Sequence, residues 1–463
     1  MNRSLLLVSV VLLIHLVLLI NTRFTLWPEM VVYPYLLNNG FVLYRDIINP
    51  YPPLLTSFLA LFAKIFGYRP MPYQILTWVV IFAADLSIFL IVKKIFKKSS
   101  YALASLLFFV ILSIPFGING LWFDLIQLPF ILFAFYYFYK GFKDKKLVFD
   151  SLFFAFFVLT IAFFIKQQVI WLIILFLTVA AIKTDKKTVF LLKKPLLLGP
   201  FLILSVSYLI LFGQKGIAND FLSWTIYFPF VSAAKMPGYV LLPTPRQIIV
   251  LLALVTLFIP LFFKRSPETN LILATATALL LFAYPRFDYF HLVPLLAILS
   301  IAFGQTIVIF KKSPLVFRLG FFLSLAVLVS FLTRYLLTSW HQQIRFFENE
   351  IIDSANFLAK ITQSSDSIYI QNGPDQIFPL AKRLPPKPWV DEFPWYLEKR
   401  DLEQRVIEGI KSQNPRFVVF KPYDVGAKYA LGVYRPQKLA DYLDQNYQNL
   451  LQISDTLMLK VRK

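Results

Sequence analysis

The sequence predicts an α-helical polytopic membrane protein with about eleven transmembrane helices, followed by a small C-terminal α/β domain outside the membrane. The first observation behind this prediction is composition, because 58% of the 463 residues are hydrophobic and 50 of them are Phe. A water-soluble chain with that composition would expose large apolar patches. A bilayer removes the conflict, since positions that face lipid must be apolar.

The second observation is a series of apolar runs in the first 340 residues. Several are shorter than the ~20 residues that a straight span needs, so their boundaries are soft. We expect residues 1–340 to form the transmembrane domain and residues 341–463 to form the soluble one. The runs lie at 4–21, 71–92, 100–115, 124–139, 147–165, 168–182, 195–212, 246–263, 269–285, 290–310 and 315–337.

The third observation is where the charge lies. Residues 1–340 hold 29 Lys/Arg and 10 Asp/Glu, whereas residues 341–463 hold 17 and 15. Of the net charge of +21, the membrane part therefore carries +19 and the tail only +2, which argues against nucleic-acid binding. A basic cluster follows every second apolar run, as in loops that obey the positive-inside rule. The clusters are Lys93–Lys98, Lys140–Lys146, Lys183–Lys194, Lys264–Arg265 and Lys311–Arg318.

This pattern predicts a protein of the plasma (inner) membrane with a cytoplasmic N-terminus and an extracytoplasmic tail. The first run lacks a small-residue cleavage site and is expected to be an uncleaved span. Two long outer loops, 22–70 and 213–245, are rich in Trp, Tyr and Pro, which suits the headgroup region. Within the first loop, the stretch Leu54–Phe66 is too short to span and is expected at the membrane interface.

The tail shows the spacing of a small α/β domain. Apolar residues from Ile344 to Ile361 recur at helical spacing. We expect strands at 367–371, 416–420 and 456–461, and helices near 399–412 and 436–447. The tail sequence contains no nucleophile–base pairing, metal-ligand cluster or phosphate loop, which favours a lid or an acceptor-positioning domain.

Acidic residues are scarce in the membrane part, and half of them fall on its predicted outer face. A carboxylate in such a place is suited to act as general base toward a sugar hydroxyl of a membrane-anchored substrate. A purely structural role is the alternative, with Asp46 as a turn cap and Asp220 as a helix cap. The outer acids are Glu29, Asp46, Asp124, Asp220 and Asp288.

The segment PEMVVYPYLLNNGFVLYRDIINPYPPLL, residues 28–55, resembles the first outer loop of the GT-C superfamily of integral-membrane glycosyltransferases. These enzymes include dolichyl-phosphate-mannose mannosyltransferases and aminoarabinose transferases, and they use polyprenyl-phosphate-linked sugars. The resemblance implies a GT-C-like fold in which an acid after the first span is the catalytic base or orients the acceptor. Many members have Asp-Glu where this chain has Pro28-Glu29, so either Glu29 or Asp46 carries that role. The matching residues are Glu29, Tyr33, Gly40, Tyr44, Asp46, Pro52 and Pro53.

Three further patches resemble the same superfamily. Asp124, in NGLWFDLIQLP, is similar to the acid that opens the fourth span. Lys166 lies at an outer turn, and YPRFDYFHLVPLL carries Arg286 and His291 near the start of a late span. The resemblance implies that Lys166, Arg286 and His291 hold the donor's phosphate, because cations at that depth suit a lipid phosphate.

The predicted function is hexosyl or pentosyl transfer from a polyprenyl-phosphate donor to a lipid, glycan or protein acceptor of the cell envelope. Some GT-C members use a divalent cation and others do not, and this sequence has no decisive metal cluster. The alternatives are a transporter or flippase of lipid-linked saccharides, or a polysaccharide polymerase or ligase.

Two ionisable residues inside predicted spans, His15 and Asp85, are expected to make interhelical hydrogen bonds.

Overall fold

The computed structural model describes residues 3–142, 149–183, 195–236, 238–263, 266–391, 396–397, 399, 401–421 and 436–463. The chain forms two compact units. Unit 1 comprises Met1–Phe24, Ile75–Ser207 and Leu242–Gln342, and unit 2 comprises Thr25–Gln74, Tyr208–Leu241 and Gln343–Lys463. The basic clusters at 143–146, 184–194 and 264–265 lie outside the described residues.

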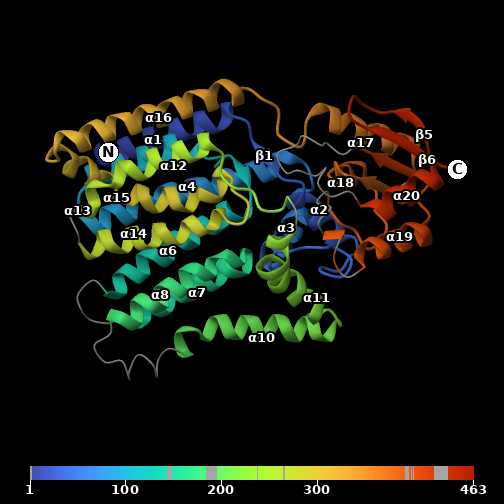
Figure 1. Cartoon of the computed structure of the whole chain (residues 1–463), viewed down its shortest axis with the longest axis horizontal. Coiled ribbons are helices and arrows are strands. Elements are labelled where there is room, and N and C mark those ends of the chain that lie inside the picture. Colours follow the sequence, from blue (N-terminus) through green and yellow to red (C-terminus); the bar gives the residue numbers. More distant parts are fainter. Residues whose placement is uncertain are drawn as a thin grey trace. The chain divides into compact units, whose positions relative to one another are not determined.

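Unit 1 is built from apolar helices that run roughly along one direction (Figure 1). The unit boundaries fall inside two of its helices, since residues 70–74 of α4 and residues 208–214 of α10 are assigned to unit 2. Its elements are α1 (Arg3–Asn21), α4 (Pro70–Phe96), α5 (Ser99–Ser113), β2 (Gly120–Leu121), α6 (Phe123–Phe142), α7 (Phe149–Ile165), η1 (Gln167–Val169), α8 (Ile170–Lys183), α10 (Gly199–Gln214), α12 (Pro245–Phe258), α13 (Pro260–Phe263), α14 (Pro267–Leu280), η4 (Leu281–Ala283), η5 (Tyr289–Leu292), α15 (Val293–Lys311) and α16 (Leu315–Ser339).

Each of the eleven predicted apolar runs overlaps one of these helices or two consecutive ones in the residues that the structure describes. Five helices in the described part of the chain are long and apolar enough to cross a membrane, which makes the chain a multi-pass membrane protein. Others, such as α5 with 15 residues and α8 with 14, are shorter than a straight span. The total of about eleven spans therefore stays a prediction.

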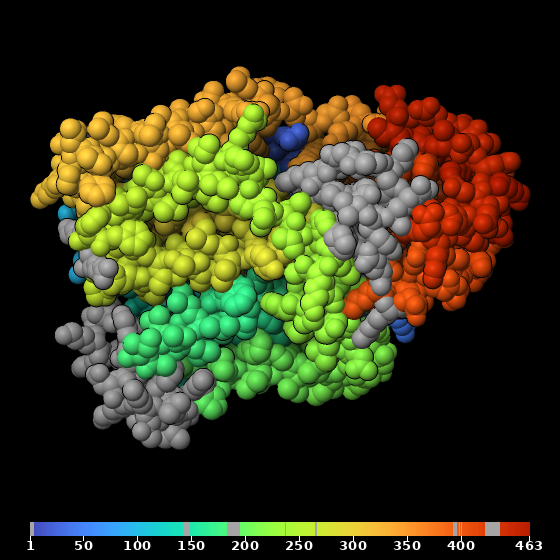
Figure 2. Space-filling view, in the orientation of Figure 1, coloured from blue at the N-terminus to red at the C-terminus, as the bar shows by residue number. Residues whose placement is uncertain are grey.

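Helix α16 shows how unit 1 meets lipid. Figure 2 shows it in orange, uncovered along its length. Large apolar side chains stand out from it, including Val316 at 75% exposure and Leu323 at 69%. In water this surface would be an aggregation site, whereas in a bilayer it is the required lipid-facing surface.

Helices α5 and α15 approach each other closely because Gly304 has no side chain. A Cβ placed on Gly304 would lie 2.6 Å from the backbone of Tyr101. The Gly304 amide also donates to the hydroxyl of Ser105 across the same contact, at 3.2 Å. Small residues at such crossings let two backbones pack, which is a main source of helix association in lipid.

The two ionisable residues of the early spans are paired. The His15 ring nitrogen Nδ1 lies 2.7 Å from Oδ2 of Asp85, and both side chains are fully buried. The predicted interhelical hydrogen bonding between α1 and α4 is confirmed.

Unit 2 combines most of the two long loops that were predicted to be outer with the tail. Its elements are β1 (Thr25–Leu26), α2 (Glu29–Asn38), α3 (Pro53–Phe66), α11 (Ala218–Leu222), the π-helix η2 (Ser223–Ser232), η3 (Ala233–Lys235), α17 (Asn349–Ile361), β3 (Ile368–Gln371), α18 (Ile377–Ala381), α19 (Leu402–Gln413), β4 (Phe417–Phe420), α20 (Gln437–Asn446), β5 (Tyr447–Gln452) and β6 (Met458–Arg462).

The tail contains a four-stranded sheet in the order β3-β4-β6-β5. Strands β3 and β4 are parallel, with Ile368 opposite Phe417, and the other two pairs are antiparallel. The three predicted strands and the two predicted helices correspond to β3, β4, β6, α19 and α20. Strand β5 was missed because five of its six residues are exposed, so it has no alternating apolar pattern.

The loop that follows α1 packs against the tail within unit 2. The Trp389 amide donates to the carbonyl of Asp46 at 2.8 Å, and the Ile48 amide donates to the carbonyl of Trp389 at 3.2 Å. Helix α3 buries Leu59 and Ala63 and exposes Leu61 and Ile65. That two-faced pattern suits the interfacial position predicted for Leu54–Phe66.

Candidate functional site

Three of the predicted site residues meet at one end of unit 1. Asp124 lies in the first turn of α6, Lys166 separates α7 from η1, and His291 lies in η5 just before α15. Since α6 begins, α7 ends and α15 begins at this end, the apolar helices themselves bring the three polar side chains together.

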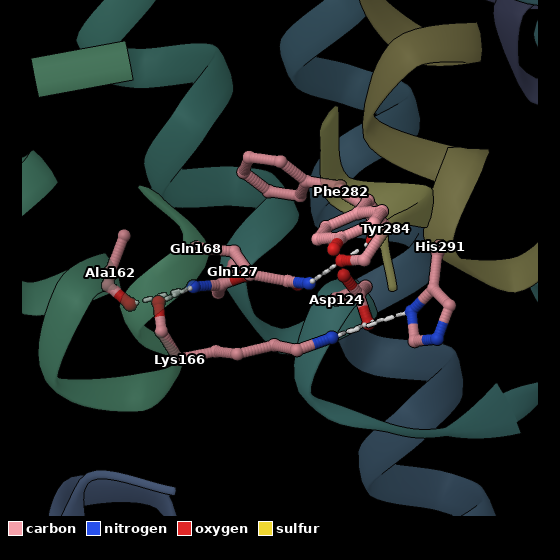
Figure 3. Close-up of polar contacts among 8 residues, drawn as sticks. All are labelled: Asp124, Gln127, Ala162, Lys166, Gln168, Phe282, Tyr284 and His291. Carbon is pink, nitrogen blue, oxygen red and sulfur yellow. Dashed lines mark hydrogen bonds and ion pairs between the residues drawn. The ribbon is translucent and has the colours of Figure 1, made fainter. Parts of the chain in front are cut away.

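We call Asp124, Lys166 and His291 the acid–base cluster. The Asp124 oxygen Oδ2 accepts from the Lys166 ammonium at 2.7 Å and lies 2.9 Å from His291 Nδ1. Lys166 Nζ and His291 Nδ1 are 3.3 Å apart. Figure 3 shows the Lys166 and His291 side chains reaching Asp124 from two sides.

Burial makes this cluster costly to build. The side chains of Asp124 and Lys166 are 1% and 5% exposed, and that of His291 is 12% exposed. Removing charges from water costs several kcal/mol per ion, which close pairing offsets only partly. The other oxygen of Asp124, Oδ1, is buried and has no hydrogen-bond partner among the described residues. A buried charged group in a membrane helix is a functional candidate by default.

Two glutamines support the cluster, as Figure 3 shows. The Gln127 amide donates to the carbonyl of Ala162 at 2.8 Å and to that of Lys166 at 2.7 Å, which fixes the end of α7. The Gln168 amide donates to the carbonyls of Phe282 and Tyr284, both at 3.1 Å. The sequence reasoning missed Gln127, although its place three residues after Asp124 puts both on one helix face.

Arg286 also belongs to unit 1. It lies five residues before His291, between η4 and η5, and it is half-buried. The direct contacts that define the acid–base cluster join Asp124, Lys166 and His291.

The remaining predicted site residues belong to unit 2, and Glu29 is the first residue of α2. Its side chain is buried, at 7% exposure, and lies in the first turn of the helix. The helix dipole at this end favours a carboxylate. Glu29 is also close enough to Tyr33 to act electrostatically on its hydroxyl.

Tyr33 is a buried hydrogen-bond donor. Its hydroxyl donates to Asp391 Oδ2 in the tail at 2.9 Å, and its ring meets the Trp389 ring edge-on at 5.5 Å. Burial, followed by the charges of Asp391, Tyr396 and Glu29, raises the pKa of Tyr33 well above its ordinary value. Tyr33 therefore keeps its proton near neutral pH and does not serve as a base.

Tyr44 lies in the core of unit 2. Its ring packs edge-on against Phe212 and Phe221 at 5.5 and 5.2 Å, and its hydroxyl donates to the carbonyl of Tyr51. The left-handed backbone at Tyr44, with φ of 71°, turns the chain tightly toward Ile47. These contacts favour a structural role for this residue.

Asp46 has its oxygens occupied. Oδ2 accepts from the Val42 amide at 3.0 Å and lies 3.5 Å from Lys387 Nζ, whereas Oδ1 accepts from Arg45 Nε at 3.1 Å. This is the turn-capping geometry that the sequence left open as the structural alternative.

The described residues contain no group of three or more His, Cys, Asp or Glu side chains that would hold a metal ion. The acid–base cluster includes only two such residues, together with an ammonium that would repel a cation. Its donor set therefore fits an anion better than a divalent metal.

Comparison with known proteins gives a consistent picture of the fold. Residues 50–212 match the family described as dolichyl-phosphate-mannose-protein mannosyltransferase. The crystal structure of ArnT from Cupriavidus metallidurans in the apo state is similar, with a TM-score of 0.63 and 13% identity, over 98% of this chain and 97% of that one. The structure of the same protein bound to undecaprenyl phosphate has a TM-score of 0.61 and 12% identity, with the same coverage. No curated protein sequence matches the chain. The family match and the shared fold confirm the resemblance to the GT-C superfamily.

Proposed function

We propose that this chain, which resembles the GT-C superfamily both in fold and in residues 50–212, transfers a sugar from a polyprenyl-phosphate donor to an acceptor hydroxyl. The observation that carries the proposal is the buried acid–base cluster at one end of the apolar helices. A membrane helix bundle retains such a costly group where a charged ligand binds.

In this proposal the acid–base cluster holds the donor's phosphate. The ammonium of Lys166 supplies the positive charge, with Arg286 and His291 assisting. Asp124 fixes the positions of Lys166 and His291 and, because it neutralises one charge, keeps the empty site stable. The similar ArnT structure bound to undecaprenyl phosphate supports a donor of this chemical class.

The reaction is an inverting displacement. The acceptor oxygen forms a bond to the anomeric carbon while the bond from that carbon to the phosphate oxygen breaks. Polyprenyl phosphate departs with the electron pair, and a carboxylate takes the hydroxyl proton.

We assign the base role to Glu29 rather than Asp46. Both oxygens of Asp46 are already engaged, by the Val42 amide, Arg45 and Lys387, in a turn-capping arrangement that favours a structural role. Glu29 is the other of the two acids to which the superfamily resemblance gives the base role. The transfer takes place on the extracytoplasmic face in this proposal, which rests on the charge asymmetry of the loops.

The test is a transfer assay with the purified full chain, radiolabelled polyprenyl-phosphate sugars and an envelope extract as acceptor. We expect label to move from the lipid to the acceptor with release of polyprenyl phosphate. Glu29→Gln should lower the rate by roughly 10²–10⁴-fold, the range for loss of a general base.

Asp46→Asn is the matched control for the base assignment. It should lower the melting temperature, because Asp46 caps a turn. It should have little effect on the transfer rate measured on the folded protein. Full activity in Glu29→Gln would remove Glu29 from the mechanism. If the lipid-linked sugar moved between the leaflets of a vesicle membrane and no new glycosidic bond formed, the flippase alternative would replace the proposal.

A further inference from the structure

Unit 2 contains a groove that the proposed transfer does not use. It has a volume of about 950 Å³ and lies beside α11 and the π-helix η2. The same region is part of the green segment on the face drawn in Figure 2. Residues 219–236 form most of its wall, and the tail contributes Lys399.

One side of the groove is apolar. Leu222, Ile226 and Phe230 line it and are 42%, 43% and 47% exposed. They recur four residues apart, so they follow one face of the helical segment. An exposed apolar strip of this kind in a membrane protein is suited to a hydrocarbon chain.

The other side carries a positive charge. Lys399 is the one charged residue among the described residues that line the groove, and it is 9% exposed. Its ammonium donates to the Ser223 carbonyl at 3.0 Å and lies 4.9 Å from the Trp224 ring and 5.0 Å from the Tyr227 ring. Aromatic faces attract a cation and help to fix its position.

Ser223 adds a second, independent indication of a ligand. Ser223 lines the groove and is 4% exposed. Its buried hydroxyl has no hydrogen-bond partner in the described part of the chain. A buried hydroxyl without a partner destabilises the fold. A ligand oxygen near Lys399 would remove that cost.

We propose that this groove binds an acidic phospholipid of the bilayer. The lipid's phosphate lies at Lys399 and Ser223, and an acyl chain lies along Leu222, Ile226 and Phe230. The charge selects an anion, and the length of the apolar wall selects a lipid over free phosphate. None of the residues assigned to the donor or the base belongs to this site, so it does not depend on the proposed transfer.

The experiment measures lipid binding to the purified full chain in neutral detergent. Phosphatidylglycerol is titrated and bound copies are resolved by native mass spectrometry, with phosphatidylcholine and inorganic phosphate in parallel. We expect phosphatidylglycerol to bind most tightly. Lys399→Met and Ser223→Ala should each weaken it about tenfold, as loss of a charge-assisted hydrogen bond does.

Two variants separate binding from folding. Lys399→Arg keeps the charge and should retain most of the affinity, whereas Lys235→Met removes an exposed lysine nearby that does not line the groove and should change nothing. Ser223→Ala should not lower the lipid-free melting temperature, because the hydroxyl has no hydrogen-bond partner among the described residues to lose.

Equal phosphatidylglycerol affinity in wild type, Lys399→Met and Ser223→Ala would overturn the proposal. Inorganic phosphate that binds as tightly as the lipid would overturn the lipid assignment. Displacement of phosphatidylglycerol by undecaprenyl phosphate would also overturn it, since the groove would then belong to the donor. Sugar transfer measured on the same samples reports separately on the proposed enzyme activity.

Discussion

Asp124 holds the ammonium of Lys166 and the ring of His291 with one oxygen. The proposed phosphate site needs a cation, because a neutral residue would bind a phosphate only weakly. A cation buried alone among apolar helices, however, would destabilise the fold. Pairing with Asp124 offsets part of the cost of burying Lys166, the cation to which we assign the donor's phosphate.

Asp124→Asn should therefore destabilise the chain by about 3–5 kcal/mol, because it leaves Lys166 as a buried charge without its counter-ion. The double variant Asp124→Asn, Lys166→Met removes both charges and should regain part of that stability while transfer stays lost. Thermal unfolding and the transfer assay on the same preparations measure the two effects. An active double variant would show that the cluster serves only the fold.

Tyr33 gives a prediction in which pH is the variable. Its pKa is raised in the folded chain, whereas an unfolded Tyr ionises near pH 10. Its contribution to stability is therefore fully present below about pH 10 and is lost as the pH rises further, by at most about 1.4 kcal/mol per unit. The difference in unfolding free energy between wild type and Tyr33→Phe should stay constant from about pH 7 to 9 and shrink above 10. A difference that changes between pH 7 and 9 would contradict the assignment.

At the scale of elements, the contact between α5 and α15 depends on one missing side chain. Gly304→Ala places a Cβ 2.6 Å from the Tyr101 backbone, so the helices must separate. We expect a loss of about 1–3 kcal/mol, the usual range for overpacking. Gly320→Ala on α16 is the matched control, since its nearest atom is 3.7 Å away, an ordinary contact. Equal melting temperatures of the two variants would argue against close packing at Gly304.

The sequence predicted the elements well where their patterns were strong. The apolar runs correspond to helices. Asp124, Lys166 and His291 were all chosen as candidates from their places at predicted span ends together with the resemblance to the GT-C superfamily. Strand β5 was missed because an exposed edge strand has no alternating apolar pattern. The support from Gln127 was missed because its hydrogen bonds reach another helix, which the local sequence does not reveal. The packing of Tyr44 against Phe212 and Phe221 joins segments far apart in the chain, which spacing alone does not reveal.

At the scale of the whole molecule, the predicted orientation has a direct test. The chain has no cysteine, so single cysteines can be introduced without background labelling. Lys98→Cys, at an exposed basic cluster, should be protected from a membrane-impermeant maleimide applied to intact cells. Lys411→Cys, at an exposed position of α19, should react. The reverse pattern would place the tail in the cytoplasm and move the proposed reaction to the other face.

The central claim is that the acid–base cluster binds the phosphate of a polyprenyl donor. The most direct measurement is the affinity of the purified chain for undecaprenyl phosphate, in wild type, Lys166→Met and Lys140→Met. Lys140 lies exposed in the last turn of α6, at the end opposite Asp124, so it controls for loss of a lysine. We predict affinity at least about tenfold weaker in Lys166→Met and unchanged in Lys140→Met, as expected for one charge-assisted contact. Equal affinity in all three proteins, each shown to be folded, would contradict the claim.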